Sequence, residues 1–441
     1  MDRRHFLKHV AAYSTLAIPG IEFVRTITAN AQTLRRNNKS VIILWMGGGP
    51  ATIDLWDLKP GRPNGGPFRE IETTAPGVRI SEHLPRVASQ MRNLAIIRSL
   101  QTTEGDHNRG TQLMHTSYTP NPAIAFPSMG SVAALEVPKL QGYEPISLPS
   151  FISVGGGGMG GNPAGFLGMN YAPFTIQNPG TPPENIRPPQ SLGSGTDLED
   201  RVRRRQRLFY ELEDQFMFGR VPHMTNPNAP IGERLKDRAK FADASKAHRD
   251  IYYKGFSLVA SKEGKIFDLK DEAPKTIENY GNNAFGRSAI MARRLVESGV
   301  SAVEISLGGW DLHGNAFDQL SGQRLPTLDR AMGSLVEDLV QRGMWQNTVI
   351  LWMGEFGRTP RINQGNGRDH WARCWSIVVG GGAIRGGQAF GATDQDGMDI
   401  ARDRMTIGDV FATVYKGLGI ETGTQVRDAI GRPFPIAGQN G

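Results

Sequence analysis

The segment Val349–Pro360 has the sequence VILWMGEFGRTP. Its first five residues are apolar and uncharged, and the run ends abruptly at Gly354. An apolar run of this length is typical of a strand that is buried on both faces of a parallel sheet. Glu355 and Arg358 follow at once, and GRDHW follows at residues 367–371. Because open α/β sheets carry their active sites at the carboxyl ends of strands, the segment predicts a strand and the edge of a site.

Similar apolar runs recur along the chain, and most of them end in glycine. They are Val41–Met46, Leu94–Ile97, Phe151–Val154, Val303–Leu307 and Ile377–Val379. Amphipathic patterns with a helical period lie between some of them, at Ala284–Ser298 and Leu325–Arg342. Alternation of strands and helices predicts an α/β fold with a doubly wound, mostly parallel sheet.

The middle of the chain has a different pattern. Residues 155–195 are rich in Gly, Pro and Asn without periodicity, and charged helical patterns follow at 197–218 and 233–260. We interpret residues 155–280 as a loop and helical insertion rather than a separate domain; a plain helical layer over the sheet is the alternative. The glycine run at 155–161 fits G-x-G-x-x-G, but Pro163 follows and no helix pattern begins there, which disfavours a dinucleotide site.

Composition and charge narrow the functional classes. The chain has 441 residues and a formal charge of +7, without a basic block interleaved with aromatic residues, so nucleic acid is not an expected partner. The one cysteine, Cys374, excludes an internal disulfide and a zinc–thiolate cluster. Its position beside Trp375 predicts a buried structural thiol, with a nucleophile as the alternative.

The N-terminus resembles a twin-arginine export signal. Residues 2–8 read DRRHFLK, a mildly apolar stretch follows at Val10–Ile18, and Ala29–Ala31 offers an A-x-A cleavage site. We therefore expect a signal peptide at 1–31, an exported or periplasmic location, and one domain at 32–441. No later apolar run approaches the roughly 18–20 residues of a membrane span.

Four polar side chains at predicted strand ends could converge on one divalent ion. Asp311 and His313 are separated by one residue in a glycine-framed turn, Glu355 follows the next strand, and His370 lies just before the last one. Carboxylate oxygens and imidazole nitrogens are common metal ligands. The alternatives are a turn held by Asp311 with a surface histidine, a salt bridge from Glu355 to Arg358 or Arg361, and a His370 ring oriented by a neighbouring carboxylate.

Other polar residues could act on the substrate. Arg358 and Arg368 could hold an anionic group through bidentate hydrogen bonds. His107, in polar and glycine-containing sequence, could be a ligand or a general acid for the leaving group, whereas His115 has apolar neighbours and could be a core histidine.

Two further candidates follow the first strand. Asp54 could complete the shell of the ion, and Thr52 could be a nucleophile. The alternative for either residue is the N-cap of a short helix.

Taken together, these segments resemble the DUF1501 family of exported bacterial proteins. The resemblance is carried by LWMGGGP at 44–50, Asp54, DLKP at 57–60, GWDLH at 309–313, EFGRTP at 355–360, GRDHW at 367–371, and GGG at 380–382 with GATD at 391–394. That family looks like a branch of the alkaline phosphatase and sulfatase superfamily.

The resemblance implies an alkaline-phosphatase-like sheet with a metal site at the strand ends. In the superfamily a Ser, Thr or modified Cys attacks a phosphate or sulfate ester, and one or two divalent ions hold the ester oxygens. The resemblance implies that Asp311 and His313 form one ligand segment, Glu355 a second and His370 a third. Few histidines and many carboxylates leave Zn, Ca, Mg and Mn all open.

The chain departs from the pattern in three places, one at a histidine ligand and two near the nucleophile. It has Glu355-Phe356 where the superfamily commonly has Asp-His, Ala51 where the family often has serine, and Asn108 where sulfatases have Cys or Ser before an arginine. Thr52, Thr111 and an activated water all stay open as the nucleophile.

The leading prediction is an exported, metal-dependent hydrolase of phosphate or sulfate esters that acts on a small anionic ester or glycan. The alternative is a non-catalytic periplasmic protein, on a degenerate phosphatase-like fold, that binds an anionic glycan or a partner protein.

Overall fold

The computed structural model describes residues 37–156, 158–181 and 266–438, together with a few positions between 183 and 212. The predicted signal peptide and most of the predicted helical insertion lie outside the described residues, so both stay predictions. Within the described ranges, no helix is both long enough and apolar enough to cross a membrane.

Eight strands of the described chain form one central sheet, in the order β12-β4-β11-β8-β1-β7-β5-β6. β1 pairs in parallel with β7 and β8, β5 pairs in parallel with β7 and β6, and β12 pairs in parallel with β4; β11 runs antiparallel to β4 and β8. The predicted fold class is therefore confirmed. The bounds are β1 (Ser40–Trp45), β4 (Leu94–Leu100), β5 (Phe151–Val154), β6 (Phe174–Ile176), β7 (Ala302–Ser306), β8 (Thr348–Met353), β11 (Trp375–Gly381) and β12 (Gln388–Phe390).

The central strands are continuously apolar because both faces of the sheet are buried. In β1, Ile42 and Leu44 belong to one core cluster, whereas Val41 and Ile43 belong to the other. Successive side chains of a strand point to opposite faces, so each apolar strand contributes to both clusters. This arrangement explains why the sequence shows unbroken apolar runs instead of an alternation of apolar and polar residues.

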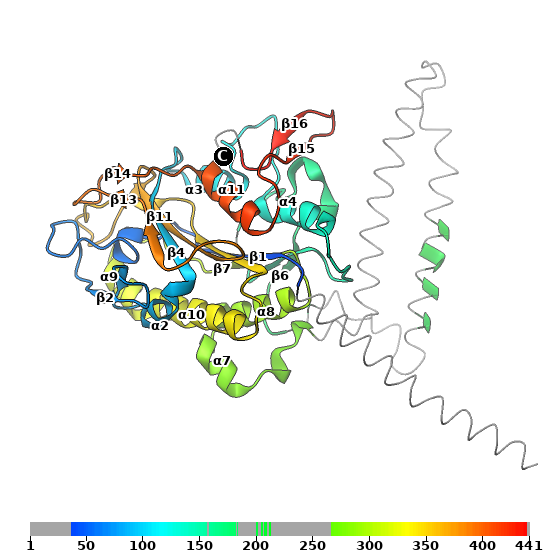
Figure 1. Ribbon diagram of the computed structural model, residues 1–441, viewed down its shortest axis with the longest axis horizontal. Helices are drawn as coiled ribbons and strands as arrows, with labels where there is room; N and C mark the ends of the chain where they lie inside the picture. The colour runs from blue at the N-terminus through cyan, green and yellow to red at the C-terminus, as the bar shows by residue number, and fades with distance from the viewer. Residues whose placement is uncertain are drawn as a thin grey trace, which may run out of the picture.

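Helices cover the sheet on both sides (Figure 1). One layer contains α2 (Pro85–Gln90), α8 (Ala284–Glu297) and α10 (Leu325–Gln341), whose apolar residues join the first core cluster. The other layer contains α3 (His107–Thr116), α4 (Met129–Glu136) and α11 (Ile407–Gly417), whose apolar residues join the second. The helices predicted at Ala284–Ser298 and Leu325–Arg342 are thus confirmed, with ends that differ by one residue.

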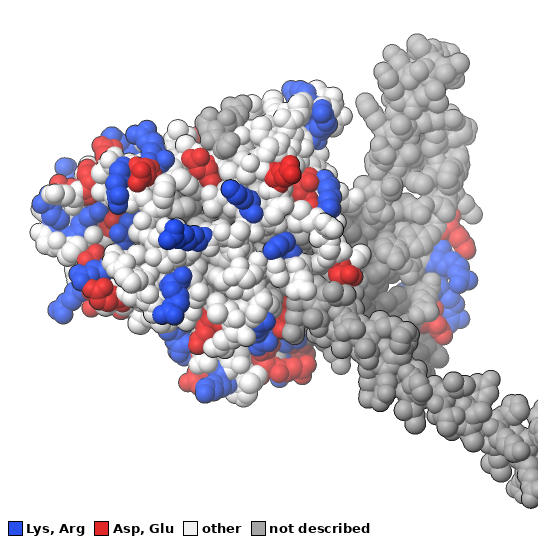
Figure 2. Space-filling model, in the orientation of Figure 1, with Lys and Arg blue, Asp and Glu red and all other residues white. Residues whose placement is uncertain are grey.

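The charged side chains on the face drawn in Figure 2 are interspersed, with Lys and Arg near Asp and Glu. Cys374 is buried, as expected for a structural thiol, and its Sγ donates to the carbonyl of Gly397 at 3.2 Å. The residues that the sequence predicts for the site lie at the carboxyl ends of the central strands.

Candidate metal site

Three neighbouring strands bring the candidate residues to one edge of the sheet. β1 pairs in parallel with both β7 and β8, so the loops that follow these strands begin side by side. Two short strands, β9 (Gly357–Arg358) and β10 (His370–Trp371), pair with each other beyond β8, and α3 begins at the same edge. The residues delivered there are His107 from α3, Asp311 and His313 after β7, Glu355 after β8, Arg358 from β9 and His370 from β10.

Gly48 allows the three loops to approach one another. Its φ is +114°, and a Cβ atom there would lie 2.4 Å from the backbone nitrogen of Asp311. Only glycine tolerates that combination of dihedral angle and contact. The Gly48 N–H also donates to Oε1 of Glu355 at 2.7 Å, so the turn after β1 contacts the turns after both β7 and β8.

Three imidazole rings surround the Asp311 carboxylate. The Nε2 atoms of His107, His313 and His370 lie 3.4, 2.9 and 3.3 Å from an oxygen of Asp311. Ligand atoms of His107, Asp311 and His370 all lie within 4.8 Å of one another. The Nε2 atoms of His313 and His370 are 3.2 Å apart. The side chains of Asp311 and His313 are nearly half exposed, so the group opens to solvent.

The opposite nitrogen of each ring has a hydrogen-bond acceptor of its own. Nδ1 of His107 lies 2.8 Å from Oε1 of Glu355, Nδ1 of His313 lies 2.9 Å from Oδ1 of Asp369, and Nδ1 of His370 lies 2.8 Å from the carbonyl oxygen of Gly105. A carbonyl or an ionised carboxylate can only accept, so each Nδ1 carries the proton and donates it. With Nδ1 as the donor, Nε2 is the nitrogen of each ring that is left to bind a metal, and all three Nε2 atoms lie near Asp311.

This set of ligand atoms suits a divalent cation. Three His nitrogens and one Asp oxygen form a known ligand set for divalent metals, and orientation of each ring by an acceptor on Nδ1 is usual at such sites. The residues present therefore fit a divalent ion held by His107, Asp311, His313 and His370.

Glu355 lies behind this group and contacts it through His107. Its side chain is buried; Oε1 accepts from Gly48 and His107, whereas Oε2 is buried with no hydrogen-bond partner in the described part of the chain. The structure thus places Glu355 as the partner of a ligand, where the sequence predicts a ligand. An unpaired buried carboxylate oxygen is costly unless positive charge lies nearby, which agrees with a cation at the site.

Among the described residues, Arg358 brings a positive charge into the site. Its buried guanidinium donates to Oδ1 of Asp311 at 2.5 Å, to the carbonyls of Gly48 and Gly49, and to Nε2 of His313 at 3.2 Å. Burial opposes ionisation of Asp311, but the hydrogen bond and charge of Arg358 lower the pKa of Asp311 to about 2. Arg358 therefore lies in the site, as predicted, with its donors directed to protein atoms rather than toward solvent.

Asp54 and Arg368 contact each other and not the metal group. Both oxygens of Asp54 accept from Arg368, at 2.7 and 2.6 Å, and both side chains are fully buried. Complete burial raises the pKa of Asp54, against the lowering effect of Arg368. The sequence predicts Asp54 as a metal ligand and Arg368 as a substrate-binding group; the structure directs both to a buried ion pair beneath the site.

Thr52 is also turned away from the histidines. It begins the short 3-10 helix Thr52–Asp54, is buried, and its Oγ1 accepts from the backbone N–H of Ser376 at 3.1 Å. Its hydroxyl thus joins a loop to β11, whereas the sequence predicts a nucleophile.

Asp369 is a site residue that the sequence analysis does not name. Its position next to His370 in the sequence suggests that it orients the His370 ring. In the structure Asp369 instead contacts His313, and this contact lowers the pKa of Asp369.

His115 lies near the far end of α3 and is buried against β7. Its Nε2 is 3.1 Å from Oε2 of Glu304, and its Nδ1 is 2.8 Å from the carbonyl oxygen of Thr111. Burial lowers the pKa of His115, but the charge and hydrogen bond of Glu304 and the hydrogen bond to Thr111 outweigh burial and raise the pKa above its ordinary value. His115 is therefore a buried, paired histidine, in line with the core alternative.

We expect His115 to stabilise the protein more at low pH than at high pH. Because its pKa is raised on folding, its contribution is fully present below the unfolded-state pKa of about 6.5 and is lost as the pH rises through the raised value. The difference in unfolding free energy between the protein and a His115→Gln variant, measured in urea at several pH values, should shrink across that range. A difference that grows with pH would contradict the pairing.

Comparison with solved structures gives similarities at low sequence identity. The chain is similar to the lipoteichoic acid synthase LtaP from Listeria monocytogenes (10% identity, TM-score 0.38, 88% of this chain and 74% of that one). It is also similar to the PsFucS1 sulfatase from Pseudoalteromonas sp. (12%, 0.35, 87% and 68%) and to alkaline phosphatase from the Antarctic bacterium TAB5 (13%, 0.34, 87% and 98%). These values are too low to carry chemistry from those proteins to this chain.

No curated protein matches the sequence significantly. The family described as "Protein of unknown function (DUF1501)" matches residues 38–441, which is nearly all of the described chain and includes every residue of the candidate site. The chain therefore belongs to the DUF1501 family.

Proposed function

We propose that the protein is an exported, metal-dependent hydrolase of phosphate or sulfate esters. The observation that carries the proposal is the convergence of three histidine Nε2 atoms on the Asp311 carboxylate in a site open to solvent. A divalent ion in such a site polarises an ester oxygen and favours deprotonation of a nearby water. The proposed location rests on the twin-arginine-like segment at 2–8.

The ligand set favours a nitrogen-preferring metal. Three imidazoles and one carboxylate suit Zn better than Ca, Mg or Mn, which prefer shells of oxygen. We propose water as the nucleophile, because the hydroxyl of Thr52 is bound by the backbone of Ser376 and is directed away from the site. The role of the described residues is then to hold the ion and to orient the rings around it.

The test is turnover of a panel of aryl phosphates and aryl sulfates by the full chain. The protein is first stripped with a chelator and then reloaded with Zn, Mn, Ca or Mg. We expect activity to return with Zn and to be lost in a His370→Ala variant, while an Asp318→Asn variant, altered at an exposed position on α9 (Ala316–Gln319), retains it. Sustained turnover by the stripped protein would exclude the proposal.

The alternative is a protein that binds anionic esters or glycans without turnover. It is favoured by the position of Thr52 and by Arg358, whose guanidinium is held by Asp311 and two backbone carbonyls. Metal-dependent binding of the aryl esters without product release, measured by calorimetry on the same reloaded samples, would identify this function.

Asp369 provides a prediction that concerns ring orientation. It is exposed and acts on the site only through Nδ1 of His313, at 2.9 Å. Loss of an outer partner of a metal-bound histidine typically weakens metal binding about 10–100-fold. We therefore expect Asp369→Ala to lower metal affinity by about that factor, and Asp369→Asn, which keeps an acceptor oxygen, to lower it less. Equal affinity for the protein and both variants would show that the carboxylate has no orienting role.

A further inference from the structure

A row of polar side chains crosses one end of the sheet, where apolar residues would be expected. Glu304 on β7 is in register with Ser153 on β5, and Ser153 is in register with Thr175 on β6. Residues in register on neighbouring parallel strands point to the same face of the sheet. The face is that of Phe151, two residues before Ser153, which packs in the core cluster beneath α4.

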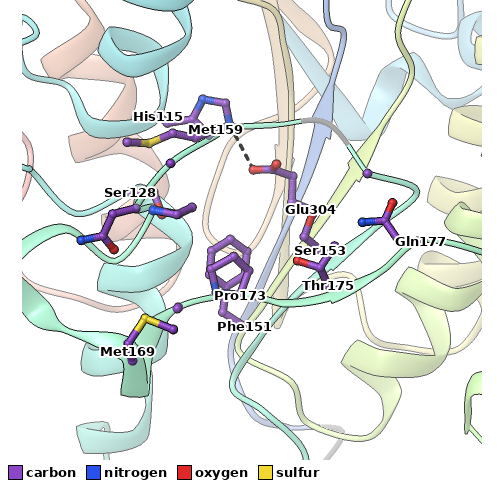
Figure 3. Close-up of a pocket in the computed structure, with 15 residues that line it drawn as sticks. His115, Ser128, Phe151, Ser153, Met159, Met169, Pro173, Thr175, Gln177 and Glu304 are labelled. Atoms are coloured by element: carbon purple, nitrogen blue, oxygen red, sulfur yellow. Dashed lines mark hydrogen bonds and ion pairs between the residues drawn. The ribbon is translucent and has the colours of Figure 1, made fainter. Parts of the chain in front are cut away.

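The polar row forms one wall of a cavity of about 310 Å³ (Figure 3). His115 lies beside Glu304 and hydrogen-bonds it, while Gln177 extends the row beyond Thr175. Apolar surface completes the cavity, from Phe151, Pro173, Met159 and Met169. Met169 is 66% exposed, so a flexible apolar side chain lies at the solvent side.

Several polar groups that line the cavity have no partner in the protein. Ser153 is 5% exposed, and its hydroxyl makes no hydrogen bond within the described residues. The side chains of Thr175 and Gln177 likewise make none with the described part of the chain. Thr175 and Gln177 are exposed, so with Ser153 they offer free donors and acceptors to an occupant of the cavity that can both donate and accept.

Gly156 and Gly161 line this cavity. Gly158 has a φ of +71°, and a Cβ atom there would lie 1.7 Å from Oε1 of Glu304. Glycine is therefore required where the loop crosses the carboxylate. The run that fits a dinucleotide pattern by sequence thus serves to bring backbone close to Glu304.

The charges of the cavity decide the kind of ligand. Its wall contains the Glu304 carboxylate, which is paired with His115, and no lysine or arginine of the described residues lines it. An anionic ligand would therefore find no positively charged side chain in the wall to pair with, and a cationic ligand would compete with His115 for the Glu304 carboxylate. An uncharged molecule with several hydroxyl groups matches the unpaired hydroxyls and amide, and its apolar faces match Phe151 and Pro173.

We propose that this cavity binds an uncharged polyhydroxylated ligand the size of a single sugar ring, at a site separate from the metal site. The volume lies near the lower end of the roughly 300–1,000 Å³ typical of small-molecule sites. His107 and His115 stand eight residues apart on α3, so the two sites are separated by about 12 Å along the helix axis. β7 joins them as well, because it carries Glu304 and leads to Asp311.

The test is ligand-observed NMR and calorimetry on the full chain with methyl glucoside, methyl galactoside and methyl mannoside, beside glucuronate, glucosamine and inorganic sulfate. We expect at least one neutral glycoside to bind and the charged compounds to bind more weakly. A Thr175→Val/Gln177→Ala variant should raise the Kd about ten-fold, since two hydrogen bonds are lost. Asn178→Ala, altered at the exposed neighbour of Gln177, should leave the Kd unchanged.

Removal of divalent metal by a chelator should not change glycoside binding, which separates this proposal from the proposed hydrolase. Both altered positions are exposed, so the variants should keep the unfolding midpoint of the protein. Absence of binding by every neutral glycoside would mean a water-filled cavity only and would overturn the proposal. Binding confined to the charged compounds, or binding that the double variant leaves unchanged, would overturn it equally.

Discussion

Replacement of Asp311 by asparagine is expected to lower the affinity for a divalent metal by at least about 100-fold. Loss of a residue that only orients a metal ligand typically lowers metal affinity about 10–100-fold, and loss of a ligand itself should lower it more. Asp311 faces the Nε2 atoms of all three histidines, at 2.9 to 3.4 Å. The amide has almost the same shape but no negative charge. Metal content after gel filtration, and competition with a chelating indicator, measure the effect.

Asp311 also accepts from Arg358, so its replacement changes two interactions at once. A His370→Ala variant removes one Nε2 atom and leaves the contact between Arg358 and Asp311 in place. Both variants should lose the metal, whereas Asp318→Asn should bind it as the protein does. If both variants retain one tightly bound ion per chain, the ion does not lie among the histidines.

The sequence predicts the fold because its central strands are buried on both faces and therefore appear as continuous apolar runs. The runs at Val41–Met46 and Val349–Met353 correspond to β1 and β8 to within one residue, and both contribute to the two core clusters. The edge strands β6 and β12 have three residues each, which is too short for a pattern to distinguish them from a loop. The antiparallel direction of β11 depends on its partners β4 and β8, which local sequence does not specify.

The sequence predicts which residues lie near the ends of the strands, and only to that extent does it predict the candidate site. Asp311, His313 and His370 follow or precede predicted strands, and the structure places them together. Strand ends do not determine the direction of a side chain. Asp54 lies at the correct edge but points beneath the site to Arg368, which is 314 residues away in the sequence.

The Asp54–Arg368 pair leads to the largest expected effect on stability. Both side chains are fully buried, and Asp54 accepts two hydrogen bonds from the guanidinium. Removal of one partner of a buried ion pair leaves an uncompensated charge and typically costs about 3–5 kcal/mol. We expect Arg368→Met to lower the free energy of unfolding by about that amount, measured by urea denaturation of the metal-free protein. Arg373→Met, which removes an exposed pair with Asp399, should cost less than about 1 kcal/mol.

The two single variants of the pair should differ because the partners have different remaining contacts. Without Asp54, Arg368 still donates to the carbonyls of Thr359, Pro360 and Asn64. Without Arg368, no other hydrogen-bond donor to Asp54 is present among the described side chains. Asp54→Asn should therefore destabilise less than Arg368→Met, and a double Asp54→Leu/Arg368→Met variant should recover part of the loss, since no buried charge remains. Equal losses in all three variants would instead assign the stability to packing of the side chains, with no separate contribution from their charges.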